Sequence, residues 1–226
     1  MKILPLLFAL ITASLPVILQ KTGLSKKYPF QNKMLCAFMY LITGVFSAIC
    51  IYKVTAFSLL ILSALVFGIL GDLFLEYKSK KFFALGAGFF AIGHIIYSYT
   101  FLFVGSYKAS ANAQAVIGIT LVITAITVFF AKTKLKLHGK KNLLLVYAPV
   151  LILAFASSLV SGINAISIGN LSYGLCLISG GILFLSSDIM IGIGKGGIKR
   201  PKFLHNAVTY TYFPAQALLA LSIYFQ

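Results

Sequence analysis

The sequence predicts an all-α fold, a polytopic membrane helix bundle with eight transmembrane helices. Hydrophobic residues make up 60% of the 226-residue chain, and only 10% of its residues are charged. Apolar runs of about 20 residues recur along its whole length, and at about 1.5 Å per helical residue each can cross a hydrocarbon core of about 30 Å. We therefore expect one transmembrane domain over residues 1–226, in a bacterial cytoplasmic membrane.

Eight apolar segments are the expected spans, and short polar connections separate them without a linker or a second domain. The first, MKILPLLFALITASLPVILQ, has the lysine and the apolar core of a signal peptide, but its long apolar extent favours a retained span. The other seven segments are longer than the first or as apolar as it is. The expected spans are residues 3–20, 34–52, 54–77, 82–104, 114–131, 142–161, 168–194 and 203–225.

The basic residues support this number of spans. Sixteen of the 19 lysines and arginines fall between spans one and two, three and four, five and six, or seven and eight. Under the positive-inside rule these connections face the cytoplasm and both termini face the other side. The formal charge of +16 is thus mainly a topology signal with some attraction to anionic membrane lipids, and it does not indicate nucleic-acid binding because the chain has little polar surface.

The three acidic residues are concentrated near the cytoplasmic ends of two descending spans. GILGDLFLEY, residues 68–77, carries Asp72 and Glu76 in the third span, and Asp188 lies in the seventh. The axial rise places both aspartates about 10 Å inside the lysine level, whereas Glu76 lies one turn closer to it, where a solvated interfacial residue is an alternative interpretation. Because an ionisable group inside the hydrocarbon usually faces a polar interior, we expect the two aspartates to converge in one shielded pocket.

Such a pair of carboxyl groups suits acid–base chemistry. In a shared dry pocket their proton affinities differ, which leaves one as an acid and the other as an anion. The same pair suits proton transport, and each aspartate could instead hydrogen-bond a neighbouring helix in a purely structural role. His94 in the fourth span is equally well interpreted as a packed residue or as part of the site, and Tyr210 in the eighth reaches the level of the aspartates.

Metal and nucleophile motifs are not evident. The three histidines are isolated from one another, so no pair lies on one helical face with the spacing of metal ligands. The three cysteines lie in apolar runs, which indicates small buried residues without a disulfide framework. No serine-nucleophile elbow is present. These residues are His94, His138 and His205, and Cys36, Cys50 and Cys176.

Three segments, in this order, resemble the YhhN-type lysoplasmalogenase-like membrane protein family. They cover roughly residues 65–104 and 174–220, and the expected eight spans fit the family throughout. Each motif alone is weak, but their combination and order are fairly specific. The segments are GDLFL with the following FFALGAGFFAIGHIIYSYTF, which contains His94 and Tyr97; GGILFLSSDIMIG, which contains Ser187 and Asp188; and YTYFPAQALL, which contains Tyr212 and Gln216.

The resemblance implies hydrolysis of the vinyl ether bond of a lysoplasmalogen to a fatty aldehyde and glycerophosphocholine or glycerophosphoethanolamine. It implies Asp72 and Asp188 as the catalytic pair, one protonating the vinyl β-carbon and the other stabilising the cation and positioning water. A lysophospholipid is then the substrate, and no metal or organic cofactor is required. The candidates for binding or orienting it are Glu76, His94, Tyr97, Ser187, Tyr210, Tyr212 and Gln216.

Two other functions stay open at this point. A proton-coupled transporter or channel would use the same carboxyl groups as a relay, although the outer halves of the second, fifth and sixth spans are almost entirely apolar, which favours a cavity open on one side. A non-catalytic lipid-binding protein or scaffold would use the aspartates only to hold helices together.

Overall fold

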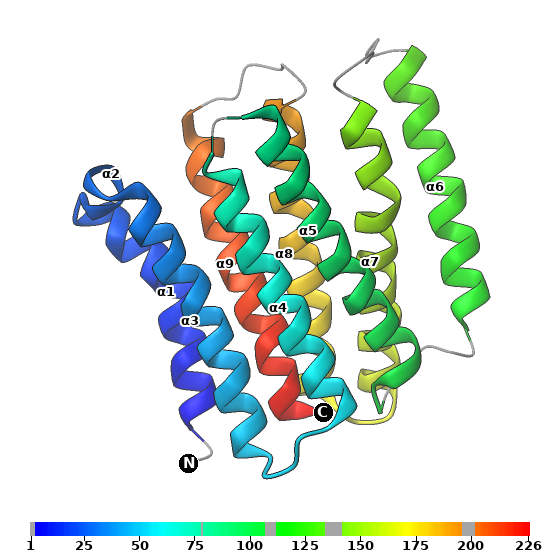
Figure 1. Cartoon of the computed structure of the whole chain (residues 1–226). Helices are drawn as coiled ribbons and strands as arrows, with labels where there is room; N and C mark the ends of the chain where they lie inside the picture. The colour runs from blue at the N-terminus through cyan, green and yellow to red at the C-terminus, as the bar shows by residue number, and fades with distance from the viewer. Residues whose placement is uncertain (1–2, 78, 107–111, 134–141, 196–201) are drawn as a thin grey trace.

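A computed structural model gives the fold, and every regular element that it describes is helical (Figure 1). The predicted all-α class is therefore confirmed. No strand occurs in the described part of the chain. The residues described are 3–77, 79–106, 112–133, 142–195 and 202–226.

Each expected span corresponds to one long helix, with small shifts at the ends. The helix of the second expected span begins at Pro29, five residues before the expected start, and the helix of the sixth expected span continues to Ser167. The helices are α1 (Leu4–Lys21), α2 (Leu24–Lys27), α3 (Pro29–Cys50), α4 (Ala56–Leu75), α5 (Lys80–Tyr99), η1 (Thr100–Val104), α6 (Ala113–Thr133), α7 (Asn142–Ser167), α8 (Leu171–Lys195) and α9 (Lys202–Phe225).

Within the described residues, six helices are long and apolar enough to cross a membrane. The chain is therefore a membrane protein by length and composition of its helices, while the expected eight spans and the sides of the termini stay predictions. Figure 1 shows both termini at one end of the bundle. The six segments are Leu4–Lys21, Pro29–Cys50, Ala56–Leu75, Lys80–Val104, Val146–Ser167 and Leu171–Gly192, and Ala113–Phe129 is a shorter apolar helix.

Local sequence signals explain where the helices around the site begin and end. Pro29 occupies the first turn of α3, where its missing N–H costs nothing. Thr55 and Ser58 form a capping box that starts α4. At the end of α5 the helix widens into the π-helical turn η1, in which the Gly105 amide donates to the Thr100 carbonyl at 2.9 Å.

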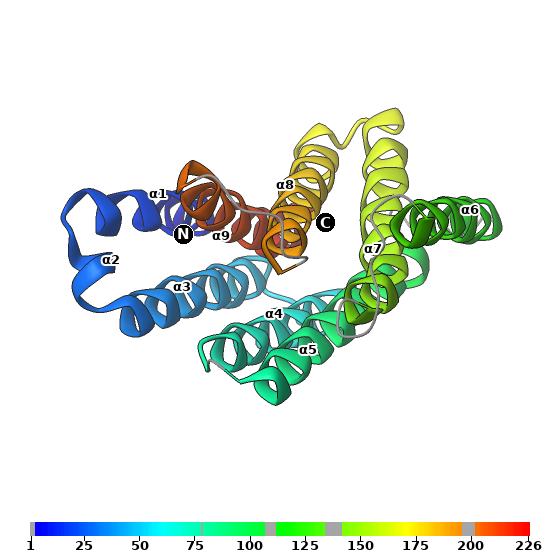
Figure 2. The ribbon, with the colours of Figure 1, turned by 90° about the horizontal axis from the view of Figure 1, so that it is seen from above.

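Helix α9 lies at the centre of the bundle, and α6 lies at its edge. Helix α9 packs against α1, α3, α4 and α8, and most of its second half is buried. Helix α6 packs against α7 and stands apart from the other helices when the bundle is viewed along its axis (Figure 2). The polar side chains of α9 therefore face the interior from the middle of the protein, between the helices that carry the two aspartates.

Candidate functional site

The carboxyl group of Asp72, in the last turns of α4, is almost fully buried and has three polar partners from two other helices. Tyr212 of α9 donates to its Oδ2 at 2.7 Å, and Tyr40 of α3 donates to the same atom at 3.4 Å. The Lys33 ammonium lies 3.5 Å from Oδ1. All three partners present hydrogens, so the oxygens of Asp72 act as acceptors, as a carboxylate requires.

Lys33 forms ion pairs with two acidic side chains, Asp72 and Glu76. It donates to the Glu76 Oε1 at 2.9 Å and to the backbone carbonyl of Asp72 at 3.1 Å. That carbonyl lies in the last turn of α4, where the helix dipole favours a cation. Lys33 thus joins the start of α3 to both acidic residues of α4.

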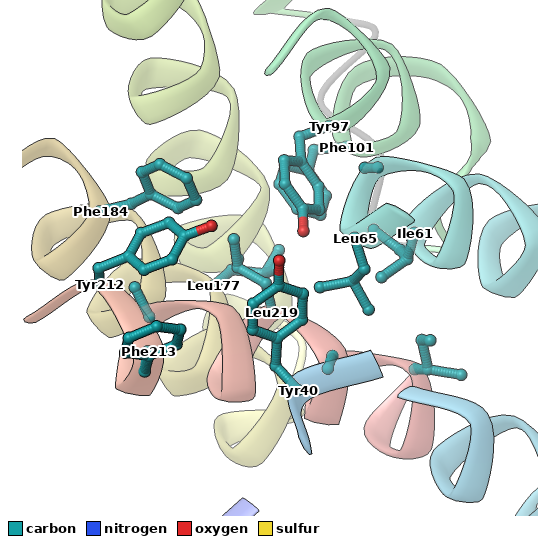
Figure 3. Packing of buried hydrophobic residues seen from close by; sticks show 14 of the residues in the cluster. Tyr40, Ile61, Leu65, Tyr97, Phe101, Leu177, Phe184, Tyr212, Phe213 and Leu219 are labelled. Carbon is teal, nitrogen blue, oxygen red and sulfur yellow. The ribbon is translucent and has the colours of Figure 1, made fainter. Parts of the chain in front are cut away.

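A directed chain of hydrogen bonds extends from Asp72 into the bundle. Tyr97 of α5 donates to the Gln216 Oε1 at 2.9 Å, and the Gln216 amide donates to the Tyr212 hydroxyl at 3.2 Å, which in turn donates to Asp72. Figure 3 shows the hydroxyls of Tyr40, Tyr97 and Tyr212 turned toward one another. We call Lys33, Tyr40, Asp72, Glu76, Tyr97, Tyr212 and Gln216 the Asp72 set.

A glycine makes room for the Asp72 set. A Cβ atom at Gly68, one turn before Asp72 on α4, would lie 2.9 Å from the Gln216 Nε2 and 3.1 Å from the Tyr40 hydroxyl. Both distances are shorter than ordinary van der Waals contacts, so a larger residue would displace these polar groups. The absence of a side chain at Gly68 lets α4 approach the hydroxyl and amide groups of α3 and α9.

Asp188, on α8, has a second set of partners from α5 and α7. Its Oδ2 accepts a hydrogen bond of 2.5 Å from Tyr147, and the His94 Nε2 lies 3.3 Å from the same oxygen. The His94 Nε2 also lies 2.7 Å from the Tyr147 hydroxyl. The three groups therefore form a closed triangle, which we call the Asp188 set, and a proton can pass between any two of them.

An aromatic ring separates the two sets. The Phe184 ring lies edge-on to His94, with centroids 4.6 Å apart, and edge-on to Tyr212, with centroids 5.5 Å apart. Among the described residues no hydrogen bond or ion pair joins the Asp72 set to the Asp188 set. Each carboxyl group thus has its own set of partners, with the Phe184 ring in contact with both sets, and the expected convergence of the two carboxyl groups in one pocket stays a prediction.

A hollow lies against both sets. Its volume is about 20 Å³, it is open to the surroundings on part of its boundary, and it lies between α5, α7, α8 and α9. Neither aspartate lines it, but His94 of the Asp188 set and Tyr97 of the Asp72 set both do. Each carboxyl group therefore reaches the hollow through one hydrogen-bonded neighbour or chain. The remaining lining residues are Phe101, Leu151, Ala154, Phe155, Ser158, Gly181, Phe184, Leu185 and Leu219.

Two of the residues expected at the site are placed elsewhere. The Ser187 hydroxyl is buried against α9, 3.5 Å from the Val208 carbonyl. Tyr210 is half-buried and belongs to neither set. The other expected residues, Asp72, Glu76, His94, Tyr97, Asp188, Tyr212 and Gln216, all belong to one of the two sets.

Lys33, Tyr40 and Tyr147 belong to the two sets but were not among the residues expected at the site. Lys33 was counted only as a topology signal, although Pro29 four residues earlier is a signal for a helix start that would have placed it on α3. His138 and the side chain of His205 lie outside the described residues, and within that described part no three His, Cys, Asp or Glu side chains gather as metal ligands.

Comparison with protein families supports the resemblance seen in the motifs. The sequence profile of the YhhN family matches residues 30–223, which include every residue of both sets. The chain belongs to the YhhN family. No curated protein and no solved structure matches it in the corresponding comparisons.

Proposed function

We propose that this YhhN protein is an intramembrane hydrolase that cleaves the vinyl ether bond of lysoplasmalogens, the activity with which its family is linked. The observation that carries the proposal is the arrangement of the two sets. Each contains a buried or nearly buried carboxyl group and presents one polar side chain, His94 or Tyr97, at the same mostly apolar hollow. The lining is mostly apolar with a few polar side chains, which is the composition of sites that bind amphiphiles, and a hollow of this size admits a water molecule.

The Asp188 set supports the acid step. A vinyl ether resists bases and nucleophiles but reacts when an acid protonates its β-carbon, which gives an oxocarbenium ion. His94 is the member of the set that lines the hollow, and its Nε2 lies within reach of Asp188 and Tyr147. In the proposed step the protonated ring of His94 gives its Nδ1 proton to the β-carbon, while Asp188 and Tyr147, which both lie at its Nε2, hold the ring in place.

The Asp72 set supports the second half of the reaction. Lys33, Tyr40 and Tyr212 all direct positive charge or hydrogens at Asp72, so we assign it the role of the fixed anion near the developing cation. The hydrogen of Tyr97 is committed to Gln216, which leaves the phenolic oxygen only as an acceptor. A water molecule that donates to this oxygen is held with its own oxygen free to attack.

The proton balance of the cycle closes without another reactant. Water adds to the oxocarbenium carbon and returns one proton to the neutral imidazole of His94, which gives a hemiacetal. Collapse of the hemiacetal transfers its hydroxyl proton to the ether oxygen, so the carbon–oxygen bond breaks to an aldehyde and an alcohol. One water molecule is consumed, and His94 regains its initial protonation state.

The test is an assay of the purified protein in lipid nanodiscs with three matched lysophospholipids: a vinyl ether, a saturated alkyl ether and an ester of the same chain length. We expect aldehyde release from the vinyl ether alone, and its loss in Asp72→Asn and Asp188→Asn variants that remain folded. Undiminished release in either variant would refute the roles assigned to the two carboxyl groups.

The same preparation distinguishes the other functions. Proton flux across liposomes without aldehyde release indicates a transporter or channel, provided that the two asparagine variants abolish the flux. Lipid retention without either activity indicates a binding protein.

A further inference from the structure

We infer that the Asp72 set and the Asp188 set are built around two copies of one carboxyl site, and that the ring each aspartate receives from the opposite half of the chain fixes its role. The first half is α1 to η1, and the second half is α6 to α9. The roles of proton donor and fixed anion rest on the proposed function, whereas the equivalence of the two sites rests on helix packing and hydrogen bonds.

The helices of the two halves pack in corresponding ways. In the described chain each half has four long helices, and the third, α4 or α8, carries the aspartate. This helix packs against the second and fourth helices of its own half, which are α3 and α5 for α4, and α7 and α9 for α8. The fourth helix also crosses to the second helix of the other half, because α9 packs against α3 and α5 packs against α7.

This arrangement is that of two repeats related by a twofold rotation about the bundle axis. Figure 2 shows α3 and α7 on opposite sides of α4 and α8. The first helices differ, since α1 also packs against α9 whereas α6 stands apart. Parallel repeats with an axis along the membrane normal are an established way to build a membrane protein.

The helix that precedes each aspartate supplies a phenol. Tyr40 of α3 donates to the Asp72 Oδ2 at 3.4 Å, and Tyr147 of α7 donates to the Asp188 Oδ2 at 2.5 Å. The second helix of each half thus has the same chemical group directed at the carboxylate of the third helix.

The fourth helix of the opposite half supplies the second ring. Tyr212 of α9 donates to the Asp72 Oδ2 at 2.7 Å, and the His94 Nε2 of α5 lies 3.3 Å from the Asp188 Oδ2. In both sets, therefore, a ring from the same half and a ring from the other half meet at one carboxylate oxygen. Tyr212 is in this sense the counterpart of His94.

These exchanged rings give the two copies different chemistry. The phenol of Tyr212 donates its hydrogen to Asp72, next to the cation of Lys33, so that copy holds a charge. The imidazole of His94 can both accept and donate a proton, and it lines the hollow. Tyr212 is thus a positioning residue for the fixed anion, at the place where the other copy has its proton donor.

A second difference lies four residues before each aspartate. Gly68 of α4 leaves room for the amide of Gln216, so hydrogen bonds continue away from Asp72. The matching residue of α8 is Phe184, whose ring lies against His94 and Tyr212 with centroids 4.6 Å and 5.5 Å away. A hydrocarbon ring therefore stands in the second copy at the position where the first copy admits polar groups.

The experiment exchanges the two rings in the full chain. Protein with His94→Tyr and Tyr212→His is labelled with ¹⁵N in histidine and studied by NMR in lipid nanodiscs. We expect this protein to fold and the signal of the introduced imidazole to shift on Asp72→Asn but not on Asp188→Asn. The His94 signal of the unaltered protein should show the opposite dependence.

A matched control places an imidazole on the same helix outside both sets. The signal from Tyr210→His should respond to neither asparagine variant, and glutamine variants identify the signals of His138 and His205. An imidazole introduced by Tyr212→His that responds to Asp72→Asn no more than this control overturns the inference. If the double exchange does not fold, Tyr212→His alone is measured. Failure of both to fold also overturns the inference, because copies of one site accept each other's ring.

The outcomes separate this inference from the proposed function. The NMR signals report hydrogen bonds and need no substrate, so the two sites can prove equivalent even if no aldehyde is ever released. Aldehyde release by the unaltered protein, together with signals that ignore the matching aspartate, removes the equivalence and leaves the hydrolysis intact. The exchanged protein should release aldehyde at least about 10²-fold more slowly, because His94→Tyr removes the proton donor from the hollow, and an undiminished rate contradicts the role assigned to the rings.

Discussion

Asp72 and Asp188 are both carboxyl groups inside the bundle, but their surroundings differ in charge. Asp72 has a lysine and two phenols as partners, and Lys33 also binds the nearby Glu76. The described partners of Asp188 are Tyr147 and His94, a phenol and an imidazole. Asp72 is thus paired with the cation of Lys33, whereas Asp188 faces the imidazole ring of His94.

The difference indicates a division of labour between a structural charge and a mobile proton. A carboxylate that is held by lysine keeps its charge while substrate enters and leaves, which suits an electrostatic role. A carboxylate that shares a histidine and a tyrosine suits proton delivery, because an imidazole can both accept and donate a proton. Substitutions in each set test this contrast.

Loss of the proton donor formed by His94 and Asp188 should have the largest effect on catalysis. Asp188→Asn and His94→Gln each remove part of the proton donor, so each should lower the rate constant for aldehyde release by about 10²- to 10⁴-fold. The double variant should be little worse than either single one, because the residues act as a unit. Single-turnover kinetics in nanodiscs measure this, and additive losses in the double variant contradict the proposed coupling.

Loss of Lys33 should affect stability more than the loss of an exposed lysine. Lys33→Met leaves Asp72 and Glu76 without their cation, and we expect the free energy of unfolding to fall by about 2 kcal/mol, less than for a fully buried pair because Lys33 is partly exposed. Lys26→Met, at an exposed lysine in α2, is the control. Thermal unfolding in detergent measures the stability of both variants.

A second substitution sharpens that result. Adding Asp72→Asn to Lys33→Met removes one of the unpaired charges, so the double variant should be more stable than Lys33→Met alone. A double variant that is less stable by the sum of both single losses would show that Lys33 does not stabilise Asp72 through charge.

A methyl group at Gly68 should disturb the Asp72 set and spare the Asp188 set. Gly68→Ala brings a Cβ against Gln216 and Tyr40, and we expect a loss of about 1–2 kcal/mol in stability from overpacking. Gly88→Ala on α5 meets no atom within 4 Å and should be neutral or slightly stabilising. Equal effects of the two alanines on thermal unfolding would remove the argument for close approach at Gly68.

The smallest effect is expected for the phenol of the Asp188 set. Tyr147→Phe removes the 2.5 Å hydrogen bond to Asp188 but keeps the ring, and we expect about a tenfold slower aldehyde release, equivalent to about 1.4 kcal/mol. Tyr210→Phe alters a tyrosine that lies outside both sets, and this variant should release aldehyde at the same rate as the unaltered protein. Initial rates at saturating substrate separate the two variants.

Much of the bundle and part of the site could be predicted from the sequence, because hydropathy and axial rise are local properties. The apolar runs locate the helices, and the scarcity of acidic residues singles out Asp72 and Asp188 as costly in a membrane. Axial rise predicts depth but not direction. Ser187 lies next to Asp188 in the sequence, yet it points about 100° away around α8 and faces α9 instead of α7.

The partners of the aspartates depend on helix packing and are harder to predict. Tyr40 is one aromatic residue in an apolar run of α3, and only the approach of α4 at Gly68 makes it a partner of Asp72. The position of Phe184 between His94 and Tyr212 likewise depends on how α8 rotates against α5 and α9. The separation into two sets therefore arises from tertiary structure that no single helix specifies.

The hydrogen bonds from Tyr97 through Gln216 and Tyr212 to Asp72 all run in one direction, so this chain has two alternative arrangements of its hydrogens. If a proton settles on Oδ2 of Asp72, Tyr212 must rotate its own hydrogen away, and the amide of Gln216 must turn over to receive it. Tyr97 then loses its acceptor and becomes a free donor at the wall of the hollow. The protonation state of Asp72 on α4 thereby determines whether the Tyr97 hydroxyl on α5 is free to donate a hydrogen bond, and no helix has to move.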